Sequence, residues 1–121
     1  MATMNKVIEY VDSVKPNVYS EEAKCKWMST LDGMISTEVM EYDSPLAYEV
    51  PRDADRELLV PHPYDDIYAL YVEAMIDFHN KEMDNYNNTV LMFSERLEKF
   101  KAWYIQRNPV CKARNFRNVM G

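Results

Sequence analysis

Glycine is nearly absent from this chain, which has only Gly33 and Gly121 among its 121 residues. Small α/β folds and β-sandwiches place glycine at their tight turns, so its scarcity argues against both classes. The same scarcity excludes a glycine-rich loop that cradles phosphate groups. Together with the helical spacing of apolar residues, this composition predicts an all-α protein, and the length predicts one domain.

Long apolar runs and cysteine motifs are missing as well. No segment approaches the roughly 18–20 consecutive apolar residues that a membrane helix requires, so we expect no membrane association. Glu9 and Asp12 interrupt the N-terminal stretch where a secretory signal would be apolar. Cys25 and Cys111 form no CxxC motif, and we expect free thiols in a reducing compartment, with a disulfide as the alternative.

The charge is distributed unevenly along the chain. Residues 1–106 hold 10 Lys and Arg against all 20 Asp and Glu, whereas residues 107–121 hold four cations and no acid. An acidic surface repels phosphates, which argues against nucleic acid wrapped around the body. We therefore divide the chain into a helical domain, 1–108, and a basic tail, 109–121. The tail is either loose chain or a contact for DNA or an acidic partner.

Apolar periodicity predicts four helices, over residues 3–14, 20–41, 63–81 and 84–107. A proline-rich connection, residues 43–62, shows no helical period. Connections of this length are uncommon inside a compact domain, and we expect this one to face a partner. The last two helices are separated by a short turn, so they should form an antiparallel hairpin.

The third expected helix has two apolar sides. Its second apolar strip contains Val72 and Ile76, and in so small a protein we expect this strip to contact another subunit. The remaining narrow polar edge carries Asp66, Glu73 and Asp77. These carboxylates share one face of the helix.

The fourth expected helix carries an apolar seam with alternating steps of four and three residues, which is typical of antiparallel helix packing. Trp103 lies off this seam. It is therefore a candidate interface residue, together with Tyr42 and Tyr48, because aromatic side chains are enriched at protein contacts. The basic candidates for contact with a partner are Arg107, Lys112, Arg114 and Arg117.

Carboxylates beside histidine raise the question of metal chemistry. A di-metal helical bundle uses a Glu-x-x-His motif on two helices, but here His79 precedes Glu82, the reverse order. His62 lies before its helix, and His79 falls at a helix end, where the helix dipole favours a cation. No nucleophile motif is present either. We therefore predict no enzyme activity, no metal and no cofactor.

Two long stretches carry a family resemblance. The first, VIEYVDSVKPNVYSEEAKCKWMSTLDGMISTEV, resembles the opening helix pair of small prophage-encoded head–tail connector proteins. The second, ELLVPHPYDDIYALYVEAMIDFHNKEMDNYNNTVLMFSERLEKFKAWY, is similar to their second half. Its motifs are L-L-V-P-x-P-Y-D-D-I-Y, E-A-M-I-D and Y-N-N. The resemblance spans residues 4–106, and the segment after Pro109 has no counterpart.

The resemblance implies a structural role in virion assembly. Connectors of this kind form a homo-oligomeric ring below the portal of a tailed phage, where they join head to tail around the DNA passage. The implied partners are further copies of the chain, the portal and tail-side connector proteins, with DNA as non-specific cargo. The implied locations are the cytoplasm of the bacterial host during assembly and then the virion.

An acidic channel wall would let the duplex slide rather than stick, so we expect Asp66, Glu73 and Asp77 to face the channel. Two alternatives stay open. A helical interaction or regulatory module acting as a dimer would differ in its assembly state. A carboxylate-bound metal enzyme would be revealed by stoichiometric metal in the purified protein.

Overall fold

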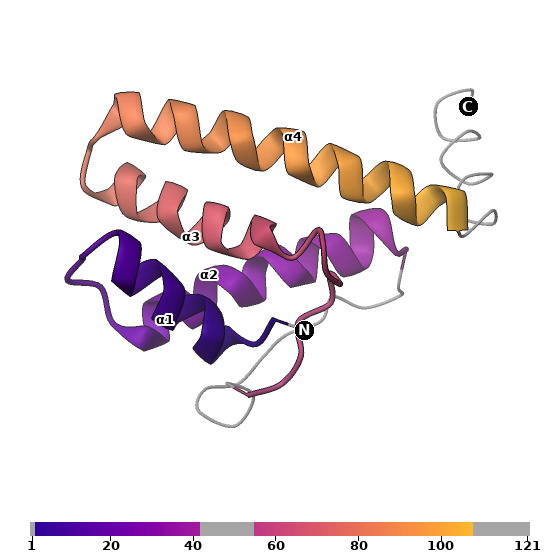
Figure 1. The fold of residues 1–121 in the computed structure, drawn as a ribbon, viewed down its shortest axis with the longest axis horizontal. Coiled ribbons are helices and arrows are strands. Elements are labelled where there is room, and N and C mark those ends of the chain that lie inside the picture. Colours follow the sequence, from indigo (N-terminus) through magenta and orange to yellow (C-terminus); the bar gives the residue numbers. More distant parts are fainter. Residues whose placement is uncertain (1, 42–54, 108–121) are drawn as a thin grey trace.

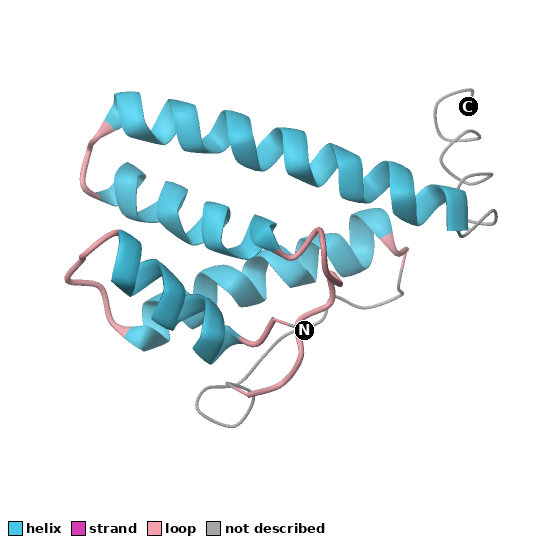
Figure 2. Cartoon of the chain, in the orientation of Figure 1, coloured by secondary structure: helices cyan, strands magenta, loops and turns pink. Residues whose placement is uncertain are grey.

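The computed structural model describes residues 2–41 and 55–107 of the chain (Figures 1 and 2). Within these ranges it contains four α-helices and one short π-helix and no strand beyond an isolated bridge between Thr3 and Glu57. The predicted all-α fold is confirmed. The elements are α1 (Met4–Val14), α2 (Glu21–Met34), the π-helix η1 (Ile35–Val39), α3 (Asp66–His79) and α4 (Met83–Arg107).

The first two helices begin at side-chain caps. The Thr3 hydroxyl accepts a hydrogen bond from the Lys6 backbone N–H at 3.3 Å, and the Ser20 hydroxyl accepts one from the Ala23 N–H at 3.1 Å. Each cap satisfies a donor that the first turn of a helix leaves free. The expected second helix, 20–41, is divided: α2 passes into η1, where the Met40 N–H donates to the Ile35 carbonyl at 3.0 Å.

The third helix begins later than the sequence predicts. We placed Pro63 in its first turn, but the chain forms turns over residues 62–65, with a cis peptide bond between His62 and Pro63, and α3 begins at Asp66. The Tyr64 N–H donates to the Pro61 carbonyl at 2.9 Å within this turn. Asp66 still lies in the first turn of the helix, where its charge suits the helix dipole.

Helices α3 and α4 run antiparallel, which confirms the predicted hairpin (Figure 1). The turn between them uses Lys81 in the left-handed region, with φ 62°, and the Glu82 N–H donates to the Asp77 carbonyl at 2.9 Å. Helix α3 lies between α4 on one side and α1 with α2 on the other (Figure 1). It is therefore the central helix of the bundle.

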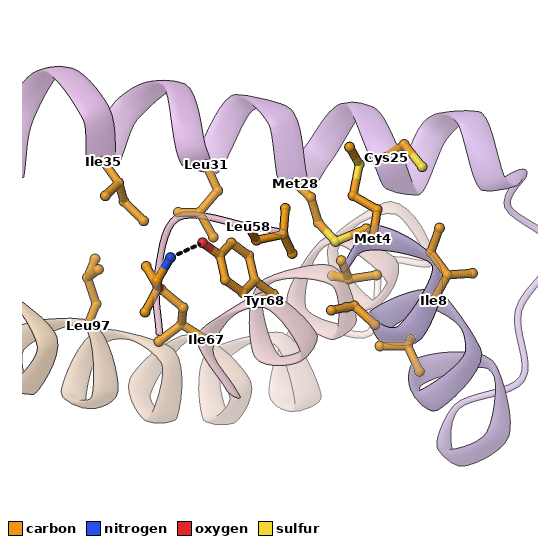
Figure 3. Packing of buried hydrophobic residues seen from close by; sticks show 14 of the residues in the cluster. Met4, Ile8, Cys25, Met28, Leu31, Ile35, Leu58, Ile67, Tyr68 and Leu97 are labelled. Carbon is orange, nitrogen blue, oxygen red and sulfur yellow. Dashed lines mark hydrogen bonds between the residues drawn. The ribbon is translucent and has the colours of Figure 1, made fainter. Parts of the chain in front are cut away.

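The core forms around α3. In Figure 3 the side chains of Met28, Leu31 and Ile35 on the α2–η1 segment point toward Ile67 and Tyr68 of α3. Helix α4 closes the other side with its apolar seam. Leu97 and Phe100 of that seam are buried, and the other members are half-buried: Tyr86, Val90, Phe93 and Tyr104.

The end of the proline-rich connection is part of the core. Leu58 and Val60 are buried, and the Leu58 N–H donates to the Ala2 carbonyl at 2.9 Å. The prediction of a partner-facing connection is therefore wrong for residues 58 and 60. Residues 42–54 lie outside the described residues.

A buried polar junction fixes this segment against the helices. The Tyr68 hydroxyl donates to Asp32 Oδ1 at 2.6 Å and accepts from the Val60 N–H at 2.8 Å (Figure 3 shows the second bond). Asp32 Oδ2 also accepts from the Leu59 N–H at 3.2 Å. One tyrosine and one aspartate thus join α2, α3 and the chain before α3, and they satisfy buried polar groups that would otherwise be costly.

Candidate interaction groove

A groove with a volume of about 490 Å³ runs between α1 and α4, with α3 at its base. We call it the α1–α4 groove. Its lining comes from three helices and the segments before α1 and α3: Ala2, Lys6, Val7, Tyr10, Asp65, Asp66, Ala69, Leu70, Glu73, Met92, Glu95 and Arg96.

Helical spacing explains how three elements build one surface. Helix α3 contributes Asp66, Ala69, Leu70 and Glu73, which follow one another at steps of three, one and three residues and so share a face. Helices α1 and α4 contribute residues at the same spacing on either side. Ala69, which has a small side chain, is one of the α3 residues at the base of the groove.

The walls of the groove are apolar and exposed. Tyr10 of α1 is 56% exposed and Met92 of α4 is 55% exposed, and the neighbouring Leu91 is 70% exposed. Of these three residues, Tyr10 and Met92 line the groove, and exposed apolar side chains that line one groove are typical of a contact surface.

The charges of the groove are mainly acidic. Four carboxylates and two cations line it, which gives a net charge of −2. Arg96 is already paired: its Nε lies 2.9 Å from Asp66 Oδ2, and its guanidinium donates to the Pro63 carbonyl at 3.0 Å. Glu95 lies 3.8 Å from Lys99 in an exposed pair that contributes little.

Glu73 lies half-buried at the base of the groove. Burial raises the pKa of its carboxyl group above the usual 4.5, the nearby Lys15 opposes this rise, and the like charge of Asp77 adds to it. The direction of this shift is that of a carboxylate for which the effect of burial outweighs that of the nearby cation. A further cation placed in the groove would lower this pKa.

The predicted acidic edge does not lie on one surface. Asp66 and Glu73 line the groove, but the Asp77 side chain is fully buried, so its expected place on a channel wall is wrong. Lys15 Nζ donates to both carboxylate oxygens of Asp77, at 2.6 and 2.7 Å. The Thr89 hydroxyl donates to Asp77 Oδ2 at 3.4 Å. Asp77 therefore joins α1, α3 and α4 rather than meeting solvent.

Val72 and Ile76 are fully buried within the single chain. The prediction that this strip contacts another subunit is therefore wrong, because both residues belong to the core of the single chain. The strip is covered because α1 and α2 pack on the side of α3 that α4 leaves open.

Trp103 is half-buried and packs against the core. Its ring lies 5.5 Å from that of Tyr64 and 6.1 Å from that of Phe100, and the exposed Arg107 guanidinium lies 4.9 Å from its centre. Trp103 also lines a shallow second pocket beside Tyr64. The other predicted contact residues lie outside the described residues: Tyr42, Tyr48, Lys112, Arg114 and Arg117.

The sequence reasoning missed the groove residues Tyr10, Leu70 and Met92. A signal was available for two of them. Tyr10 and Met92 are both apolar residues that lie outside the periodic apolar faces of their helices. Only the arrangement of α1 and α4 around α3 shows that these two side chains face the same groove.

Two general properties of the described chain bear on its class. Residues 2–41 and 55–107 hold no group of three or more His, Cys, Asp or Glu side chains placed to bind a metal ion. None of the helices in these ranges is long and apolar enough to cross a lipid bilayer.

Cys25 is a free, buried thiol whose pKa is raised by burial and by the charge of Glu21.

Comparison with known proteins finds no match. No protein-family model, no curated protein and no solved structure is significantly similar to the chain. The resemblance to phage connectors therefore stays a prediction from the sequence motifs.

Proposed function

We propose that this protein is a structural subunit that forms a ring around the DNA passage between the head and tail of a tailed phage. The observation that carries the proposal is the α1–α4 groove, with its exposed apolar walls formed by Tyr10 and Met92 and its acidic base at Glu73. Ring assembly needs one surface on each subunit that receives a different surface of the next subunit. The groove is suited to the receiving role.

The positions of the motif residues are consistent with an assembly role. In the stretch that resembles connectors, Leu58 and Val60 fill the core, Asp66 pairs with Arg96, and Tyr68 holds the buried junction with Asp32. These residues give the helical hairpin a fixed shape against the other helices. A subunit of a ring must have a fixed shape, because each copy positions its neighbour.

The test is the assembly state of the full-length protein. We expect mass photometry and negative-stain electron microscopy to show closed rings as concentration rises, or on addition of the portal protein encoded in the same prophage. A discrete dimer at every concentration, with or without the portal, would contradict the connector proposal and favour the regulatory module.

A further inference from the structure

We infer that the basic tail of one copy, the segment 109–121, docks into the α1–α4 groove of the next copy. This inference rests on the proposed ring, and it names the two surfaces that meet between subunits. It also places Asp66 and Glu73 at the subunit contact instead of on the channel wall.

Charge and polarity match between the two surfaces. The groove carries a net charge of −2 and apolar walls. The segment carries Lys112, Arg114 and Arg117 and no acid, and it has apolar residues before, between and after these cations: Val110, Phe116, Val119 and Met120. A basic segment with apolar side chains can fill the walls of the groove while a cation approaches Glu73.

The base of the groove lacks the cation that the segment would bring. Within the described residues, the Glu73 carboxylate forms no hydrogen bond or ion pair, and Lys15, the cation that acts on it, is held at 2.6 Å by Asp77. A lysine or arginine from the segment would therefore find a half-buried carboxylate without a competing partner. Contacts of this kind are charge-assisted and stronger than neutral hydrogen bonds.

The segment begins beyond the N-terminal end of α3, at the extended end of α4. Helix α4 has 25 residues and α3 has 14, so α4 extends beyond α3 at its C-terminal end by about 16 Å at 1.5 Å per residue. Figure 1 shows this end reaching past the other helices. Arg107 also lies eleven positions beyond Arg96, the last groove residue on α4. The segment thus starts away from the groove of its own chain.

A pair of charge-reversal variants tests the contact in the full-length protein. One variant carries Glu73→Lys in the groove, and the other carries Lys112→Glu, Arg114→Glu and Arg117→Glu in the segment. We expect each variant alone to associate about tenfold more weakly than the wild type, which corresponds to about 1.4 kcal/mol per contact. An equimolar mixture should recover assembly, because each reversed segment then meets a reversed groove and each original segment meets an original groove.

Two further variants serve as controls. Glu22→Lys makes the same charge change on α2, which contributes nothing to the groove, and it should assemble like the wild type. Glu95→Lys changes an exposed residue of the groove and should reproduce the weakened association if Glu73→Lys impairs folding, which circular dichroism would show.

The possible outcomes separate this inference from the proposed function. Rings that persist unchanged in both charge-reversal variants would overturn the docking of the segment while leaving the connector proposal intact. A mixture that fails to recover assembly, although each folded variant is impaired, would also overturn it. A wild-type protein that never oligomerises, with or without the portal, would contradict the proposed function and the docking together.

Discussion

The Tyr68 hydroxyl holds three segments together through two short hydrogen bonds, one donated to Asp32 and one accepted from the Val60 N–H. Removing a buried hydrogen-bonding group costs about 1–3 kcal/mol, since its partners keep their desolvation penalty. We therefore expect Tyr68→Phe to lower the free energy of unfolding by roughly that amount in urea denaturation.

Tyr71→Phe is the matched control for this substitution. Tyr71 is half-buried on the same helix, and its ring packs 5.3 Å from that of Phe93. Loss of its hydroxyl should change the free energy of unfolding by less than about 0.5 kcal/mol. If both variants unfolded at the same urea concentration as the wild type, the buried junction would contribute nothing to stability.

Glu73 gives a second prediction at the residue scale, one that depends on pH. Its pKa in the folded protein lies above 4.5, so the folded chain binds the proton more tightly than the unfolded chain. The unfavourable contribution of the charged group is therefore present above the folded pKa and disappears as pH falls below 4.5.

Glu73→Gln removes this charge, so the variant should be more stable than the wild type at pH 7. The gain should be less than about 1 kcal/mol, because solvent screens a half-exposed carboxylate. Denaturation of the monomeric protein as a function of pH would show the two curves converging below pH 4.5. A gain that grows as pH falls would contradict the sign of this shift.

At the scale of single residues, the sequence indicated which apolar side chains are buried better than it indicated which side chains they contact. Tyr68 lies on the first of the two apolar sides of the third expected helix, but nothing near Asp32 indicates that these two side chains meet, 36 positions apart. Asp77 was assigned to a solvent-facing edge because it follows Glu73 at helical spacing. Its burial depends on Lys15, which periodicity within one helix cannot reveal.

At the scale of elements, α3 packs against the other three α-helices of the described residues. Its two apolar sides were visible in the sequence, and both are largely buried, although Phe78 in the last turn is 47% exposed. The second side is covered by α1 and α2 instead of another subunit, since a periodic pattern shows that a face is buried and not what covers it. The π-helix η1 was also missed, because the sequence showed only a helix that fades near residue 40.

Ile76 and Leu91 should therefore respond in opposite ways to truncation. Ile76 is fully buried in α3, so Ile76→Ala should lower the free energy of unfolding by about 2–5 kcal/mol. Leu91 is 70% exposed on α4, so Leu91→Ala should leave the stability of the monomer within about 0.5 kcal/mol of the wild type. Thermal unfolding followed by circular dichroism measures both.

The assignment of Ile76 to the core can be contradicted by experiment. If Ile76→Ala left the monomer stable and abolished its assembly, the strip with Val72 would be a contact between subunits after all. Full burial of both side chains within one chain argues against that result.

At the scale of the whole molecule, polar contacts between distant segments hold the N-terminal part of the chain to the hairpin. Lys15 and Asp77 are 62 positions apart, Tyr19 donates to Asn80 Oδ1 at 2.7 Å across 61 positions, and the Trp27 ring stacks on that of His79 at 5.4 Å. All of these contacts lie near the C-terminal end of α3. They fix the α1–α2 pair against the hairpin and so help to set the shape of the groove between α1 and α4.

The pair between Lys15 and Asp77 is the strongest of these contacts, because the Asp77 side chain is fully buried and that of Lys15 is 25% exposed. Lys15→Ala leaves a buried carboxylate without its cation, so it should lower the free energy of unfolding by about 3 kcal/mol. Lys99→Ala, which breaks the exposed pair with Glu95, should cost less than about 0.5 kcal/mol. Urea denaturation at low and high salt would check both, since salt screens the exposed pair but reaches the buried one much less. Equal effects of the two substitutions would show that α1 is held to α3 by apolar packing alone.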